Sequence, residues 1–156
     1  MKRLAVITLL LAVTLASLQC NSLKKVEAEA FPIGYTELHN YFVLNTLEHK
    51  QTLRLVIDDQ PTFERYFGRA AVMGKNGEPT RVDFRKQFVL AVVLPETNRA
   101  TTVIPGEISQ VGNTVIFNYI VRKGDKQSHK VVPFAAVAID KPESTADFEF
   151  YFKQTN

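Results

Sequence analysis

The apolar run Phe88–Leu94 (FVLAVVL) places the strongest constraint on the fold. Successive side chains of a β-strand point to opposite faces of the sheet, and in this run both alternating sets are apolar. A strand of this kind must be covered on both sides. The run therefore predicts a central strand that is buried on both of its faces.

Shorter runs rich in aromatic and β-branched residues predict further strands. They are Asn40–Thr46, Thr52–Ile57, Thr101–Val111, Thr114–Arg122, Val131–Ile139 and Phe148–Phe152. Gly112-Asn113 and Gly124-Asp125 supply the residues that tight turns require, so we expect an antiparallel meander after Pro95. Pro133 has no N–H to donate, and we expect a bulge or a sheet edge there.

One short helix is predicted near residues 60–68. Asp58-Asp59 provides an acidic cap, and Pro61 suits the first turn because its missing N–H would have no partner there. Phe63 and Phe67 fall on one face at helical spacing, which indicates packing onto a sheet, while Gly68 favours an early end.

These elements fit one domain, because a chain of 156 residues lies within the usual range of roughly 100–200 residues for a single domain. We expect a mainly β (α+β) fold, an antiparallel β-sandwich or open barrel of about seven strands with the one short helix. Residues 37–156 are predicted to form this β-rich domain.

The first 19 residues have the pattern of a secretory signal. A cationic start is followed by an apolar run from Leu4 to about Leu15 and then by small residues. The run is shorter than the roughly 20 apolar residues of a membrane-spanning helix. We expect residues 1–19 to be a signal peptide, residues 20–36 to be a tether, and the protein to be exported to the cell envelope.

Cys20, the only cysteine, lies where a bacterial lipoprotein signal has its lipidated residue. We expect a lipid on Cys20 to anchor the protein to a membrane, as an outer-membrane lipoprotein, with the periplasm as the alternative location. Gln19 and Ser17 depart from the usual lipoprotein pattern, so cleavage by ordinary signal peptidase is the alternative. Its candidate sites follow Ala16, Ala28 and Ala30.

The charges and histidines argue against several classes of function. The formal charge of +3 falls to +1 without Lys2 and Arg3, and the basic residues form no continuous stripe, so no nucleic acid is expected as a partner. His39, His49 and His129 lack metal-ligand spacing, so we expect no metal and no cofactor. Ser128 and His129 would point to opposite faces of a strand and could not form a catalytic pair.

Part of the chain resembles a known family. The segments are the helix sequence FERYFG, the run VDFRKQFVLAVV (Val82–Val93) and the strand VVPFAAVAI (Val131–Ile139), within a region from Val56 to Lys141. Their order resembles the carboxy-terminal domain of the protease complex subunit PrcB type, found in exported bacterial proteins. The family usually has a Gly-Gly-Tyr-like turn after the central strand, whereas this chain has Pro95–Thr101. The resemblance implies a noncatalytic protein that binds or stabilises another envelope or secreted protein, such as a protease.

The candidate partner-binding residues lie in two predicted loops. They are Glu96, Thr97, Asn98 and Arg99 in the first loop, and Lys123, Asp125 and Lys126 in the second. A carbohydrate or small-ligand binder is the alternative, and it would use exposed aromatic residues. Those to inspect are Tyr35, Tyr41, Tyr119 and Tyr151. A hydrolase whose acidic residues come from different strands is the third hypothesis, and no catalytic residue is assigned.

Overall fold

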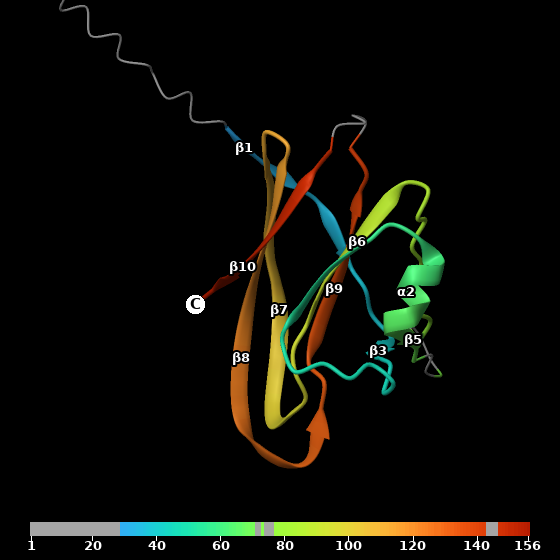
Figure 1. Ribbon diagram of the computed structural model, residues 1–156, viewed down its shortest axis with the longest axis vertical. Coiled ribbons are helices and arrows are strands. Elements are labelled where there is room, and N and C mark those ends of the chain that lie inside the picture. Colours follow the sequence, from blue (N-terminus) through green and yellow to red (C-terminus); the bar gives the residue numbers. More distant parts are fainter. Residues whose placement is uncertain (1–28, 71–72, 74–76, 143–146) are drawn as a thin grey trace, which may run out of the picture.

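The computed structural model describes residues 29–70, 73, 77–142 and 147–156, and within these ranges it is mostly strand (Figure 1). The elements in chain order are β1 (Ala30–Ile33), β2 (Tyr35–Glu37), β3 (Tyr41–Val43), β4 (Leu53–Ile57), α2 (Gln60–Tyr66), β5 (Phe67–Arg69), β6 (Gln87–Val93), β7 (Thr97–Val111), β8 (Thr114–Val131), β9 (Phe134–Asp140) and β10 (Glu149–Thr155). The prediction of a mainly β fold with one short helix is confirmed. The described strands outnumber the predicted seven because several of them are only three or four residues long.

The strands form three sheets. An outer sheet has the order β1-β7-β8-β10, a central sheet has the order β2-β9-β6-β4, and β3 and β5 form a two-stranded sheet. Figure 1 shows the outer sheet on one side of the central sheet and α2 on the other. Most strand pairs are antiparallel, as expected of a sandwich, but β10 runs parallel to β8.

The central strand β6 connects two hydrophobic clusters. Val89, Ala91 and Val93 face the cluster that includes Phe63 of α2, and Leu90 and Val92 face the cluster between the two larger sheets. All five β6 residues have no measurable exposure. The prediction of a strand buried on both faces is therefore confirmed, with α2 and the small sheet covering one face and the outer sheet the other.

The helix α2 begins where the sequence indicated. Asp59 is the N-cap and accepts a hydrogen bond from the backbone N–H of Thr62 at 2.7 Å, and Pro61 lies in the first turn. Phe63 is buried, with its ring centroid 5.1 Å from those of Tyr41 and Phe67. The helix ends at Tyr66, because Phe67 takes an extended conformation and starts β5.

The expected tether overlaps two strands of the fold. β1 pairs with β7 in the outer sheet, and β2 pairs with β9 in the central sheet, so the chain crosses between the sheets at Gly34. The predicted domain boundary at residue 37 is therefore placed too late, and the folded part includes residues from Ala30 onward. The predicted signal peptide (residues 1–19) and Cys20 lie outside the described residues.

The meander predicted after Pro95 is one long hairpin in the structure. Gly112-Asn113 forms its two-residue turn, with Val111 paired to Thr114 and Gly112 at φ 60°. The second predicted turn, at Gly124-Asp125, is wrong, because both residues lie inside β8. Pro133 is neither a bulge nor an edge residue. It precedes β9, and its carbonyl accepts a hydrogen bond from Leu94 N–H at 2.8 Å.

Candidate functional site

The pairing of β7 with β8 brings the two predicted partner-binding segments together. Arg99 is the register partner of Lys126, and Thr101 is the partner of Lys123. The Arg99 Nη1 atom also donates a hydrogen bond to the Gly124 carbonyl at 3.2 Å. The two loops expected from the sequence are thus one structural unit. We call residues 96–104 and 121–131 the distal ribbon.

Gly124 and Asp125 form a bulge in this ribbon. Between the two register pairs β7 advances by two residues and β8 by three, so β8 carries one extra residue. A Cβ atom on Gly124 would lie 2.9 Å from the Ala100 carbonyl oxygen. The glycine is therefore required by the close approach of two backbones, and not by a turn.

The distal ribbon has an open edge along β8. On the side away from β7, β8 is paired with β10 only over Thr114–Ile120. No other described strand pairs with that side over residues 121–131. Figure 1 shows β7 and β8 continuing beyond the end of β10. Backbone groups of β8 that point away from β7 in this stretch have no strand to pair with among the described residues.

Basic side chains are concentrated on the distal ribbon. It holds five basic residues and two acidic ones: Arg99, Arg122, Lys123, Lys126 and Lys130 against Glu96 and Asp125. All seven are exposed. The Lys130 Nζ atom donates to the Glu96 Oε2 atom at 2.7 Å, and this hydrogen bond raises the pKa of Lys130 above its ordinary value. The remaining charge of the ribbon is positive.

The four tyrosines proposed for ligand binding have different surroundings. Tyr119 is only 1% exposed and packs in the cluster between the larger sheets, so its assignment as an exposed aromatic is wrong. Tyr151 is 59% exposed on β10. Tyr35 and Tyr41 are half-buried, and Tyr41 lines a cavity on the α2 side of the central sheet.

His49 and His129 lie in different parts of the fold. The His49 Nε2 atom lies 3.0 Å from the Leu94 carbonyl, and His129 is an exposed residue of β8 beside Ser128. Within the described ranges, no three His, Cys, Asp or Glu side chains are grouped so as to hold a metal ion. In the same ranges no helix has the length and apolar character needed to cross a membrane.

Comparisons with known proteins give no further guidance on this site. The chain has no significant match among protein-family models, curated proteins or solved structures. The resemblance to the PrcB-type domain therefore stays a prediction from the sequence motifs.

Proposed function

We propose that this protein is a noncatalytic interaction module of the cell envelope, exported by its signal segment and held at a membrane through a lipid on Cys20. It binds an extended segment of another envelope or secreted protein along the open edge of β8. The observation that carries this proposal is the length of β8, which runs from Thr114 to Val131 but is paired by β10 only as far as Ile120.

An unpaired strand edge is a binding surface in its own right. An incoming extended segment forms main-chain hydrogen bonds with the edge, and these give affinity with little regard to sequence. Residues 121–131 are long enough for a typical strand of about 5–6 residues. The segment would extend the outer sheet beside β8, beyond the point where β10 ends.

The charge of the ribbon selects the kind of segment that fits. Arg122, Lys123 and Lys126 are exposed within the unpaired stretch, and Asp125 is the only acidic residue there. Acidic side chains on the incoming segment would complement these cations, which favours fast association and a fixed register. We therefore propose an acidic partner segment, and the PrcB resemblance makes a protease or its accessory chain one class of partner.

The edge of the central sheet at β4 offers a weaker surface. The central sheet ends at β4, which has five residues and carries Arg54 as its single charged side chain. A segment bound at β4 would gain fewer main-chain hydrogen bonds and little charge complementarity. The open part of β8 is the better site on both counts.

Charge reversal on the ribbon tests the proposal. The full-length protein carrying Lys123→Glu and Lys126→Glu is compared with the wild type in affinity capture from its native envelope. We expect the recovered partner to fall by about tenfold, corresponding to about 1.4 kcal/mol. Lys50→Glu with Lys153→Glu makes the same charge change elsewhere and should leave capture unchanged. Equal recovery with the ribbon variant and with the wild type would contradict the proposal.

A further inference from the structure

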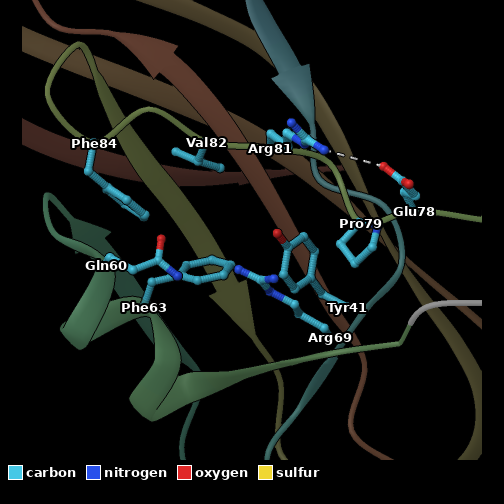
Figure 2. Close-up of a pocket in the computed structure, with 9 residues that line it drawn as sticks. All are labelled: Tyr41, Gln60, Phe63, Arg69, Glu78, Pro79, Arg81, Val82 and Phe84. Carbon is cyan, nitrogen blue, oxygen red and sulfur yellow. Dashed lines mark ion pairs between the residues drawn. The ribbon is translucent and has the colours of Figure 1, made fainter.

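A second candidate site lies on the opposite side of the central sheet from the distal ribbon. It is a cavity of about 460 Å³ between α2, the β3–β5 sheet and the segment 78–84, shown in Figure 2. This volume lies in the range of roughly 300–1,000 Å³ that is usual for small-molecule sites. None of its lining residues belongs to the ribbon.

Aromatic rings form the wall of this cavity. The Phe63 ring centroid lies 5.1 Å from that of Tyr41, in an edge-to-face arrangement, and 5.8 Å from that of Phe84. Val82 and Pro79 complete the apolar lining. Such a wall favours a ligand with a flat apolar body, because a further ring can stack on or edge against those already present.

One cation in the cavity, Arg69, has no counter-charge among the described residues. In Figure 2 the Arg69 side chain extends from the end of β5 toward the rings of Phe63 and Tyr41. Its guanidinium makes no hydrogen bond or ion pair with another described residue. Arg81, by contrast, pairs with Glu78 at 3.7 Å at the rim. The free charge that a ligand meets is therefore positive.

The Tyr41 hydroxyl is a polar but uncharged group of the cavity lining. It donates to the Thr80 carbonyl at 2.7 Å, and burial raises the pKa of the phenol above 10.0 while the charge of Arg69 acts in the opposite direction. Tyr41 thus remains a neutral group at physiological pH. It adds no negative charge that would compete with a ligand for Arg69.

The segment that forms the far wall is held at both ends. Near its start, Thr80 exchanges hydrogen bonds with His39, and the Asn40 side chain donates to the Glu78 carbonyl at 3.0 Å. Near its end, the Arg85 guanidinium contacts both carboxylate oxygens of Asp83 at 3.0 and 3.2 Å.

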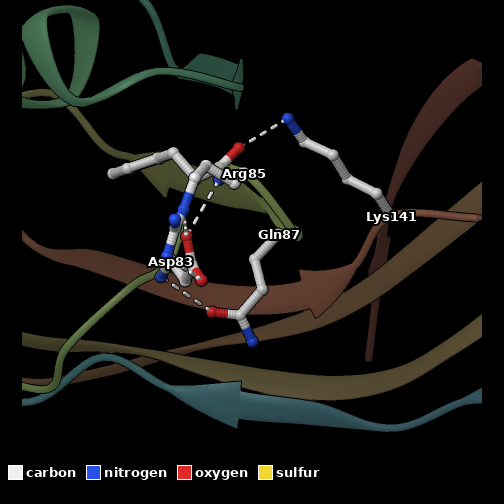
Figure 3. A network of polar contacts seen from close by, with 5 residues as sticks. Asp83, Arg85, Gln87 and Lys141 are labelled. Atoms are coloured by element: carbon white, nitrogen blue, oxygen red, sulfur yellow. Dashed lines mark hydrogen bonds and ion pairs between the residues drawn. The ribbon is translucent and has the colours of Figure 1, made fainter.

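Two further contacts fix that end, as Figure 3 shows. The Asp83 backbone N–H donates to the Gln87 side chain at 3.2 Å, and the Lys141 Nζ atom donates to the Phe84 carbonyl at 2.7 Å. Phe84 is thus positioned by contacts at the start of β6, where Gln87 lies, and directly after β9, where Lys141 lies. These contacts order one wall of the cavity before a ligand enters, which reduces the entropic cost of binding.

From this geometry we infer that the cavity binds a small aromatic monocarboxylate, with its ring against the partly exposed rings of Tyr41 and Phe84 and its carboxylate on Arg69. The planar guanidinium can donate two parallel hydrogen bonds to a carboxylate. A cationic ligand would be repelled by Arg69, and an uncharged ring would leave the guanidinium without a partner.

Ligand titration followed by NMR tests this inference on the full-length protein. The probe is phenylacetate, and we expect saturable shifts of the Phe63, Phe84 and Tyr41 signals with a dissociation constant on the order of 1 mM or tighter. 2-Phenylethanol and 2-phenylethylamine share the ring but lack the carboxylate. They should bind at least about tenfold more weakly, since they lose the charge-assisted hydrogen bonds to Arg69. Equal affinity for the three probes, or no shift of the cavity signals with phenylacetate, would overturn the inference.

A variant isolates the role of Arg69. Arg69→Gln should weaken phenylacetate binding by about tenfold, while Arg54→Gln, on β4 and outside the cavity lining, should bind as the wild type does. If Arg69→Gln does not fold, the comparison of the three probes on the wild type still tests whether a carboxylate is required for binding. Unchanged binding to a folded Arg69→Gln protein would contradict the inference and leave the β8 proposal unaffected.

A fourth probe, N-acetylphenylalanine, distinguishes two sources of the ligand, because the carboxy terminus of a peptide presents the same carboxylate as a free small acid. Tighter binding than phenylacetate would identify a chain end as the source of the ligand, and weaker binding a free small acid.

Discussion

At the scale of single residues, Asp59 determines where α2 begins, and through α2 it positions Phe63. Its carboxylate accepts the Thr62 N–H, and hydrogen bonding from the Thr62 side chain, together with this backbone bond, lowers the pKa of Asp59 below its ordinary value. A group whose pKa is lowered by folding stabilises the fold when ionised, and this contribution is lost as the pH falls through the folded-state pKa.

We therefore predict that Asp59→Ala lowers the midpoint of thermal unfolding by a few degrees at neutral pH, because an N–H of the first turn loses its partner. Asn is an equally good cap, so Asp59→Asn should lie close to the wild type. Thermal unfolding followed by circular dichroism from pH 7 to pH 3 measures both. The difference in unfolding midpoint between the wild type and Asp59→Ala should become smaller below about pH 4. A difference that is constant over this range would contradict the assigned role of the carboxylate.

At the scale of elements, the sequence predicts those strands whose apolar pattern shows which of their faces are buried. The apolar run of β6 and the alternating Phe150 and Phe152 of β10 describe burial directly, and α2 carries a recognisable cap. The sequence predicts a turn at Gly124, where the structure has a bulge. A glycine beside an acidic residue is common in both, and only the register of β7 against β8 distinguishes a bulge from a turn.

Long-range pairing also explains what sequence reasoning missed at the site. Arg99 and Lys126 are distant in the chain, and only the long hairpin makes them neighbours. In the sequence, the basic residues of the ribbon therefore form no continuous stripe. The short strands β1 and β2, interrupted by Gly34, gave no alternating pattern long enough to be distinguished from a tether.

Two glycines provide a matched test of the bulge. Gly124→Ala should destabilise the protein by about 1–3 kcal/mol, because the added Cβ would meet the Ala100 carbonyl oxygen. Gly34→Ala should be neutral or slightly stabilising, since a Cβ there has no atom within 4 Å and the unfolded chain loses freedom. Urea unfolding of both variants gives the comparison. A Gly124→Ala protein as stable as Gly34→Ala would show that the two backbones do not approach as described.

At the scale of the whole molecule, the proposed binding edge of β8 and the proposed membrane anchor make separate contributions. The predicted signal segment and Cys20 precede β1 in the sequence, and hydrophobic clusters cover both faces of the central sheet. An anchor attached at Cys20 would hold the domain near a membrane without entering its core.

The anchor is tested by Cys20→Ser. We expect the variant to move from the membrane fraction to the soluble fraction, because it has no thiol to carry a lipid, while its folded domain keeps the circular dichroism of the wild type. Fractionation followed by immunoblotting measures the change. If the variant stays with the membrane as the wild type does, the lipid anchor is wrong.

The central claim is that residues 121–131 of β8 receive another chain, and amide hydrogen exchange tests it most directly. In the free protein, both alternating sets of amides should be protected over Thr114–Ile120, where β8 has a strand on each side, but only the set facing β7 over residues 121–131. Adding the captured partner should protect the second set over 121–131 and leave β4 unchanged. Protection that appears at β4 or elsewhere, with the amides of residues 121–131 still exchanging fast, would contradict the account.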